Sequence, residues 1–248
     1  MLKILLLDIE TAPNVVYTWG LYNQNIAINQ IDRPGYTLCW SAKWLGDDTV
    51  HFSSIRKGKD AMLNRIHRML GEADVVVTYN GKKFDIPTLN KEFIINGLPP
   101  PAPYKHVDLY QVVKSTFRFV SNKLDWICRQ LEIGSKMEHK GHELWVGCMS
   151  GDKDDWKVME AYNRQDVKLL EEAYLVIRPW IYSHPSYAAV SGDVRCPKCG
   201  GYHLQRRGHT ITAVHKYPRY QCQDCGGWAR GNKTLLPRVP ERVVNVAV

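Results

Sequence analysis

Two carboxylates, Asp8 and Glu10, end an apolar run near the start of the chain. Residues 4–7 are apolar and are bounded by a lysine and an aspartate, which predicts a buried strand. Because side chains alternate along a strand, Asp8 and Glu10 share one face and repel each other. A hard divalent cation with oxygen ligands would offset this repulsion. The simpler alternative is that Asp8 only ends the strand and Glu10 is solvated.

A third carboxylate, Asp85, follows the turn sequence Asn80-Gly81 and directly precedes Ile86-Pro87. This context predicts that Asp85 lies at the start of a helix, near the end of an apolar strand at 75–79. Phe84 is expected to anchor the loop between them as an apolar residue. An N-cap is the alternative role for Asp85, because aspartate is a common capping residue.

A fourth carboxylate, Asp166, lies one helical turn after Tyr162 in a predicted helix at 155–177. Both residues fall on the apolar stripe of that helix, which predicts that they are buried. A buried carboxylate is costly without a partner, so Asp166 is expected to pair with an arginine, a cap or a metal.

The elements that must position these carboxylates alternate between strands and helices. Residues 36–44 and 49–53 read as strands joined by a turn at Gly46-Asp47-Asp48, which predicts an antiparallel three-strand start. Apolar spacing then predicts helices at 60–70 and 86–96 on either side of the strand at 75–79, and several helices before 178. Residues 107–112 fit a further strand or a short helical turn. The expected fold is therefore α/β, with a mixed sheet flanked by helices.

The composition and charge are those of a globular protein with one basic end. The 248 residues allow one substantial core and a small appendage, and no stretch is long and apolar enough for a signal peptide or a membrane span, so we expect a cytoplasmic protein, in a bacterial cell or a phage-infected host. Ten Lys and Arg against three Asp and Glu from 191 onward give +7 of the net +8. This basic end favours a nucleic-acid partner, although a solvated tail would give the same count.

Four of the seven cysteines form two C-x-x-C pairs, each followed by two glycines: Cys196, Cys199, Cys222 and Cys225. Two such knuckles with a hairpin-length spacer predict a zinc ribbon that holds one structural Zn²⁺. A redox-active C-x-x-C is the alternative. Cys39, Cys128 and Cys148 are scattered and are expected to pack in the core.

Taken together, Asp8-Ile9-Glu10-Thr11, Asn80-Gly81-Lys82-Lys83-Phe84-Asp85 and Tyr162-x-x-x-Asp166 resemble the three exonuclease motifs of the DnaQ-like superfamily. The tyrosine four residues before the last aspartate resembles the DEDDy branch, which includes the proofreading domains of family-B DNA polymerases and phage-encoded relatives. The resemblance covers residues 3–177. It implies a ribonuclease-H-like fold in which the four carboxylates hold two Mg²⁺ or Mn²⁺ ions and Tyr162 orients the attacking water.

The same resemblance implies substrate contacts, which are less specific. Thr11 looks like the residue that contacts the terminal nucleotide in relatives. Phe84 and Asn80, in the second motif, are expected to contact the substrate too. Plain structural roles for these residues are the alternative. Residues 123–136 resemble the helical segment before the third motif. Residues 14–29 resemble a substrate-side insertion, or form an ordered surface loop.

The sequence thus predicts a metal-dependent 3′→5′ exonuclease that acts on single-stranded 3′ ends, with DNA favoured over RNA. We expect a catalytic domain at 1–180, a linker at 181–192, a zinc ribbon at 193–232 and a tail at 233–248. The ribbon is expected to engage nucleic acid or a replication or repair protein, and no membrane. The rival of another class is a non-catalytic nucleic-acid-binding adaptor.

Overall fold

The computed structural model describes residues 2–237 and divides the chain into two compact units. The larger unit comprises Lys3–Tyr174, and the smaller one comprises Leu2 and the described residues from Leu175 onward. Residues 238–248, which make up most of the predicted tail, lie outside the described residues.

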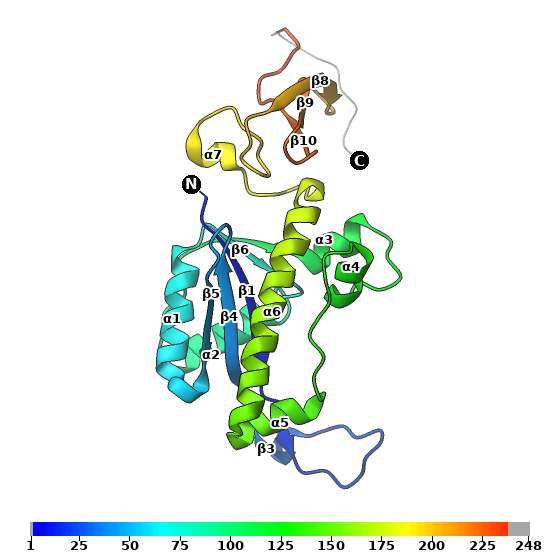
Figure 1. Cartoon of the computed structure of the whole chain (residues 1–248). Coiled ribbons are helices and arrows are strands. Elements are labelled where there is room, and N and C mark those ends of the chain that lie inside the picture. Colours follow the sequence, from blue (N-terminus) through cyan, green and yellow to red (C-terminus); the bar gives the residue numbers. More distant parts are fainter. Residues whose placement is uncertain (1, 238–248) are drawn as a thin grey trace. The chain divides into compact units, whose positions relative to one another are not determined.

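The larger unit alternates strands and helices in the order that the sequence predicts (Figure 1). Its strands are β1 (Ile4–Thr11), β2 (Val15–Val16), β3 (Ile31–Arg33), β4 (Thr37–Trp44), β5 (Val50–Ser54), β6 (Val75–Thr78) and β7 (Lys105–Asp108). Its helices are η1 (Ile28–Gln30), η2 (Ile55–Lys57), α1 (Lys59–Glu72), α2 (Asp85–Ile95), α3 (Leu109–Thr116), α4 (Leu124–Gln130), α5 (His142–Ser150) and α6 (Lys153–Ile177), whose last residues lie in the smaller unit.

Five strands form one mixed sheet in the order β5-β4-β1-β6-β7. Strands β1, β4 and β5 are antiparallel, which confirms the predicted three-strand start. Strands β6 and β7 run parallel to β1, as connections through helices require. The predicted α/β class is therefore confirmed. A separate pair, β2 and β3, lies between β1 and β4 in the sequence.

The sheet buries apolar side chains on both faces. One face packs Leu5, Leu7 and Ile9 of β1 against apolar residues of α1 and α2. The opposite face packs Cys39 of β4 against apolar residues of α5 and α6. Because side chains alternate along β1, Asp8 and Glu10 point to the face that α6 covers (Figure 1).

The structure differs from the sequence-based expectation at residues 107–112. The strand β7 ends at Asp108, and α3 begins at the next residue. The reason is local: the Asp108 carboxylate accepts a hydrogen bond of 3.0 Å from the backbone N–H of Tyr110 and thereby caps α3. A second, smaller difference is that α1 continues past Gly71 to Glu72.

The smaller unit contains η3 (Arg178–Trp180), the short helix α7 (Tyr187–Ser191) and the strands β8 (Leu204–Ile211), β9 (Lys216–Cys222) and β10 (Trp228–Arg230). The strands form an antiparallel sheet in the order β10-β9-β8. The helix α7 lies within the predicted linker.

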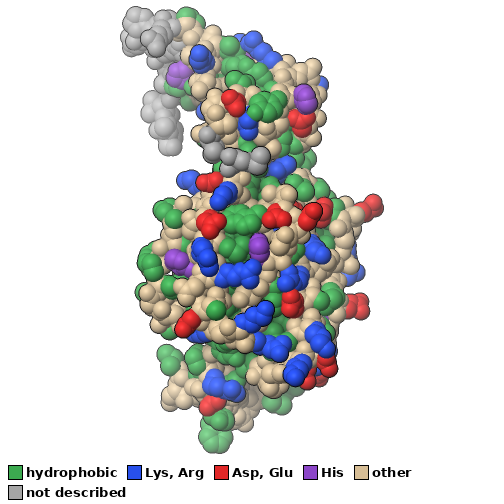
Figure 2. Space-filling model, turned by 60° about the vertical axis from the view of Figure 1, so that its left-hand side comes forward, with side chains coloured by type: hydrophobic (Ala, Val, Ile, Leu, Met, Phe, Trp, Pro, Cys, Tyr) green, Lys and Arg blue, Asp and Glu red, His purple; other side chains and the backbone are tan. Residues whose placement is uncertain are grey.

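Within residues 2–237, none of the helices has both the length and the hydropathy that crossing a bilayer requires. On the face drawn in Figure 2, acidic and basic side chains are interspersed. This mixture agrees with the small net charge of +1 that remains for residues 1–190 when the +7 of the C-terminal part is subtracted from +8.

Candidate functional site

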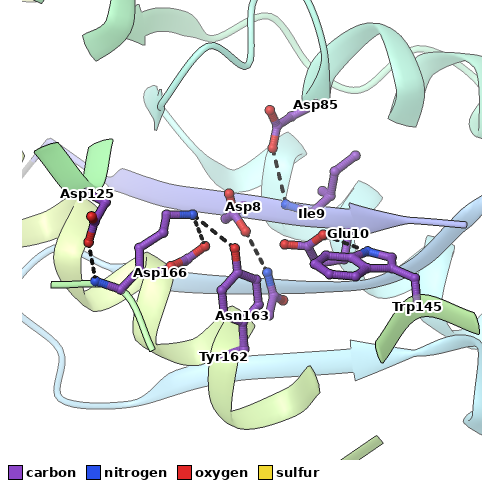
Figure 3. Close-up of polar contacts among 10 residues, drawn as sticks. Asp8, Ile9, Glu10, Asp85, Asp125, Trp145, Tyr162, Asn163 and Asp166 are labelled. Carbon is purple, nitrogen blue, oxygen red and sulfur yellow. Dashed lines mark hydrogen bonds and ion pairs between the residues drawn. The ribbon is translucent and has the colours of Figure 1, made fainter. Parts of the chain in front are cut away.

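Three of the predicted carboxylates meet between β1 and α6. Asp8 and Glu10 come from β1, and Asp166 comes from α6 (Figure 3). One carboxylate oxygen from each lies within 4.8 Å of one from each of the others. Asp166 is buried, whereas Asp8 and Glu10 are half-buried. The arrangement leaves two acidic groups accessible beside a third that is not.

Asp85 lies at the first turn of α2, as predicted, but its carboxylate is not one of the three that meet. Its Oδ1 accepts a hydrogen bond of 3.2 Å from the backbone N–H of Ile9, the residue between Asp8 and Glu10 (Figure 3). This N–H is available because β6 ends at Thr78, before it would reach Ile9. The N-cap alternative is wrong, because Phe84 is the N-cap residue and Asp85 is the first residue of the helix.

The loop that carries Asp85 is held by Asp108. The Asp108 carboxylate accepts hydrogen bonds from the backbone N–H groups of Asn80, at 2.8 Å, and Lys82, at 3.1 Å. Glycine is required at position 81, because a Cβ there would lie 2.3 Å from Oγ1 of Thr78. Asn80 has a φ of 66°, which asparagine tolerates better than most residues.

Phe84 does not anchor this loop, contrary to the expectation from its apolar character. Its side chain is 44% exposed. The backbone hydrogen bonds to Asp108 fix the loop instead, so that Phe84 is not needed in the core.

One face of α6 supplies three polar side chains to the site, from Tyr162, Asn163 and Asp166 (Figure 3). The Nδ2 of Asn163 donates a hydrogen bond of 2.6 Å to Oδ2 of Asp8. Asn163 is fully buried. This hydrogen bond therefore fixes the orientation of the Asp8 carboxylate from the buried side of the site.

A lysine that the sequence analysis did not single out completes the cluster. The Nζ of Lys136 lies 2.5 Å from Oδ2 of Asp166 and donates a hydrogen bond of 3.1 Å to the Tyr162 hydroxyl. The backbone N–H of Lys136 donates to Oδ1 of Asp125 at 2.8 Å. The expected basic partner of Asp166 is thus a lysine rather than an arginine.

Aromatic side chains cover the other end of the site. The indole N–H of Trp145, from α5, donates a hydrogen bond of 3.1 Å to Oε2 of Glu10 (Figure 3). The ring of His139 contacts both Trp145 and Tyr162, with centroid distances of 5.1 and 4.8 Å. These edge-to-face contacts hold the phenol of Tyr162 beside the carboxylates.

The electrostatics of the site favour binding a cation. Burial raises the pKa of Glu10 to about 7, and the Asp166 carboxylate adds to this effect. Burial also raises the pKa of Asp85 to about 7. The pKa of Asp8 rises well above its ordinary value, through burial and through repulsion from Glu10, Asp85 and Asp166. The Lys136 ammonium lowers the pKa of each of these groups but does not cancel the effect.

The donor set fits a hard divalent ion. Oδ1 of Asp166 is buried, and no described residue donates a hydrogen bond to it. A buried carboxylate oxygen of this kind is costly unless something else neutralises it. Together with accessible oxygens of Asp8 and Glu10, it offers the all-oxygen ligands that Mg²⁺ or Mn²⁺ prefers.

A cavity of about 410 Å³ opens beside the carboxylates. Asp8, Asn80 and Lys136 line it together with the segment Asn122–Asp125. The cavity therefore joins the second motif to the segment 123–136. Thr11 is the last residue of β1, where the pairing with β4 shifts by a bulge, and it is half-buried. In the segment 14–29, Trp19 is fully exposed.

The four predicted zinc cysteines meet in the smaller unit. The sulfurs of Cys196 and Cys225 lie 3.8 Å apart, and those of Cys199 and Cys222 lie 3.7 Å apart. Four thiolates about 2.3 Å from a zinc ion in a tetrahedron lie about 3.8 Å from each other, so the cluster fits one structural zinc ion. The free cysteines Cys39, Cys128 and Cys148 are buried, as expected.

The two knuckles repeat the same backbone geometry. The N–H of Cys196 donates to the carbonyl of Gly201 at 2.8 Å, and that of Cys222 donates to Gly227 at 2.9 Å. In each knuckle a glycine N–H also points at the second sulfur, at 3.4 Å. N–H donors aimed at sulfur stabilise thiolates, which is the form that binds zinc.

The sequence located every member of the acidic cluster but missed three residues that support it: Lys136, Asn163 and Trp145. Asn163 carried a usable signal, because it lies three residues before Asp166 on the inner face of one helix. Lys136 and Trp145 reach the site from a loop and from α5, so that only the tertiary fold brings them there.

Comparison with known proteins places this architecture. The chain resembles the family B DNA polymerase from the hyperthermophilic archaeon Pyrobaculum calidifontis, with a TM-score of 0.52 and 16% sequence identity over 88% of this chain. It spans about a third of the polymerase, 32% of its length, so the likeness concerns the fold. The comparison with curated protein sequences gives no match. The family model described as RNase_H superfamily matches residues 5–176, and the chain therefore belongs to the RNase H superfamily.

Proposed function

We propose that this protein is a divalent-metal-dependent 3′→5′ exonuclease of the DEDDy branch of the DnaQ-like superfamily. Membership of the RNase H superfamily supports a nuclease as the general class. The observation that carries the proposal is the meeting of Asp8, Glu10 and Asp166 within 4.8 Å, with Tyr162 one helical turn before Asp166.

Asp8, Glu10 and Asp166 are proposed to hold the divalent ions, and Asp85 to complete the set from α2. When bound, two such ions activate a water, hold the scissile phosphate and stabilise the leaving 3′ oxygen. The hydrogen bond from the Ile9 N–H to Oδ1 of Asp85 holds this carboxylate against the strand that carries Asp8 and Glu10. Its pKa of about 7 allows it to be ionised at slightly alkaline pH.

Tyr162 is proposed to orient the attacking water. Burial, supported by the charge of Asp166, raises the pKa of its phenol, so the hydroxyl keeps its proton at neutral pH and can donate a hydrogen bond. Lys136 is a positioning residue in this scheme, because it holds both the Tyr162 hydroxyl and the Asp166 carboxylate. The hydrolysis forms a bond from the water oxygen to phosphorus as the bond to the 3′ oxygen breaks.

The cavity beside Asp8 is proposed to receive the terminal nucleotide, with Asn80 in its wall. Thr11 directly follows the acidic pair on β1 and is proposed to contact the same nucleotide. Phe84, which precedes Asp85 and has an exposed ring, is the third proposed substrate contact. Single-stranded DNA is the proposed substrate. An exoribonuclease with the same centre is the alternative, since the cluster itself does not read the sugar.

The smaller unit is proposed to be a zinc ribbon that engages nucleic acid, or a replication or repair protein. The four clustered sulfurs support the zinc, and the +7 charge from residue 191 onward supports the nucleic acid. We also propose the domain limits stated above, with the ribbon at 193–232.

The test is to incubate the pure protein with 5′-labelled single- and double-stranded DNA and RNA, with and without Mg²⁺ or Mn²⁺. We expect a ladder of shortened products from single-stranded DNA that depends on the metal. Binding without cleavage of any of these substrates would instead support the adaptor.

A further inference from the structure

The ribbon sheet carries two arginines directly opposite each other. Arg219 of β9 and Arg230 of β10 are cross-strand partners, and both are exposed. Directly opposed residues of an antiparallel pair point to the same face, and like charges in this position destabilise the sheet. An anion on that face would remove the penalty.

No carboxylate in the described part of this unit neutralises the two arginines. The unit contains only two acidic residues within that part, Asp193 and Asp224. Asp193 pairs with Arg195, and Asp224 pairs with His203. The charge of Arg219 and Arg230 is therefore available to a ligand.

Each of these arginines also lies over an aromatic ring on the same face. The guanidinium of Arg219 is 4.8 Å from the ring centroid of Trp228, and that of Arg230 is 4.3 Å from that of Tyr217. The backbone carbonyl of Arg207 accepts a hydrogen bond of 3.0 Å from Nε of Arg219, which fixes this side chain. The result is an alternation of rings and positive charges along this face.

The sheet alternation separates this group from other basic residues of the ribbon. Arg206 lies opposite Tyr220, which points away from the face of Arg219 because the two are adjacent in β9. A surface hollow of about 490 Å³ is lined by Trp228, Arg219 and Arg230. The fully exposed Tyr182 also lines this hollow. The hollow, the rings and the charges thus belong to one face.

We infer that the face formed by Tyr217, Arg219, Trp228 and Arg230 binds single-stranded nucleic acid, with Trp228 stacking on a base and the two arginines contacting phosphates. Every base offers an aromatic face, and cationic side chains next to rings follow the backbone, so that this chemistry suits single strands of any sequence. The inference deepens the role in nucleic-acid binding proposed for the ribbon. The face is expected to bind single strands more tightly than duplexes, because the bases of a duplex are already stacked on each other.

The test measures the affinity of the full-length protein, in magnesium-free buffer, for a fluorescent single-stranded oligothymidine and for an abasic sugar–phosphate strand of equal length. Trp228→Ala should weaken binding of the oligothymidine by roughly 5- to 100-fold and leave the abasic strand nearly unaffected, because only the first has bases to stack. The double variant Arg219→Gln with Arg230→Gln should weaken binding of both strands and reduce the slope of log affinity against log salt by about 1.4, because each phosphate contact on a single strand contributes about 0.7.

Two variants on the same ribbon serve as matched controls. Tyr202→Ala removes an exposed ring that also has an arginine over it, at 4.6 Å, but this arginine is neutralised by Asp193. Arg206→Gln removes one charge from the other face. Both should bind oligothymidine nearly as the wild type does. Zinc content shows that each variant is folded, and Trp228→Phe, which keeps a ring, should recover most of the affinity.

The inference is overturned if Trp228→Ala binds oligothymidine as tightly as the wild type, or if it weakens the abasic strand equally. It is also overturned if Tyr202→Ala causes the same loss, which would indicate a general effect of exposed rings. These outcomes are separate from the exonuclease proposal. A chain that cleaves but is insensitive at Trp228 overturns only the binding face, and one that binds as expected but never cleaves overturns only the exonuclease.

Discussion

The ammonium group of Lys136 lies 2.5 Å from Oδ2 of Asp166 and 3.1 Å from the hydroxyl of Tyr162. It is the one basic group, among the residues that the structure describes, that contacts two of the predicted catalytic side chains. Burial lowers the pKa of this lysine, but Asp166, Tyr162 and Asp8 together raise it further, so the pKa lies above its ordinary value and Lys136 is charged at neutral pH. The site is thus pre-organised by a cation that belongs to the protein itself.

Replacing this cation should shift the pH dependence of cleavage. In Lys136→Met the pKa values of Asp8, Glu10 and Asp85 should rise further, because the ammonium now lowers each of them. The acidic limb of the rate profile should therefore move to higher pH, by about one unit. Lys140→Met is the matched control, since Lys140 pairs with Asp155 of the same helix α6 at 2.8 Å. An unchanged profile in Lys136→Met would mean that the lysine only supports the fold.

The binding of divalent ions should depend on pH through Glu10 and Asp85. Burial raises the pKa of Glu10 from an ordinary 4.5, and that of Asp85 from 3.8, to about 7 in the metal-free chain. Since the folded state holds these protons more tightly, the metal-free protein should lose stability as the pH rises from about 4 to about 7. Metal ions need the ionised carboxylates and should reverse this trend.

Thermal unfolding with and without Mn²⁺ checks the pH dependence. The increase in Tm that the ion causes should be small near pH 5 and large near pH 8. An increase that is equal at both pH values would show that the ion binds elsewhere.

Tyr162→Phe should slow cleavage without preventing metal binding. The substitution removes the hydroxyl but keeps the ring and all four carboxylates, and a misplaced water costs up to about 100-fold in rate. Single-turnover rates measure the loss, while the Mn²⁺-induced change in Tm should stay as in the wild type. A normal rate would leave Tyr162 as a packing partner of His139 and Trp145.

The sequence was informative wherever the function depends on local spacing. Asp8 and Glu10 share a face because a strand alternates, and Tyr162 and Asp166 are neighbours because a helix turns every 3.6 residues. The same holds for the knuckles around Cys196 and Cys222, where the glycines mark the turns.

It was uninformative where the contact partner is distant in the chain. The loop before Asp85 is tied by Asp108, which lies in the next strand, and not by Phe84 beside it. Likewise, Lys136 lies in a loop whose position in the fold does not follow from local spacing, so its pairing with Asp166 was not predicted. Hydrogen bonds between remote elements have no periodic signature in the sequence.

The ribbon should contain one zinc ion per chain and should depend on it for folding. Cys199→Ser removes one of four clustered sulfurs, and a structural zinc site supplies most of the folding free energy of so small a module. Zinc content should fall to near zero, and residues from 191 onward should become sensitive to proteases. Cys128→Ser, in the core of the larger unit, should keep its zinc. A zinc-free wild type would support a redox role for the cysteines.

The most direct test of the account compares two aspartates of one helix. Asp166→Ala removes a member of the carboxylate cluster, whereas Asp154→Ala removes an exposed aspartate near the start of α6 that pairs with Lys157. We measure how fast each variant and the wild type shorten 5′-labelled single-stranded DNA in Mn²⁺. The rates are compared once the Tm of each variant is shown to equal that of the wild type. We expect a loss of at least about 100-fold for Asp166→Ala and a wild-type rate for Asp154→Ala. Wild-type cleavage by Asp166→Ala would contradict the assignment of the active site.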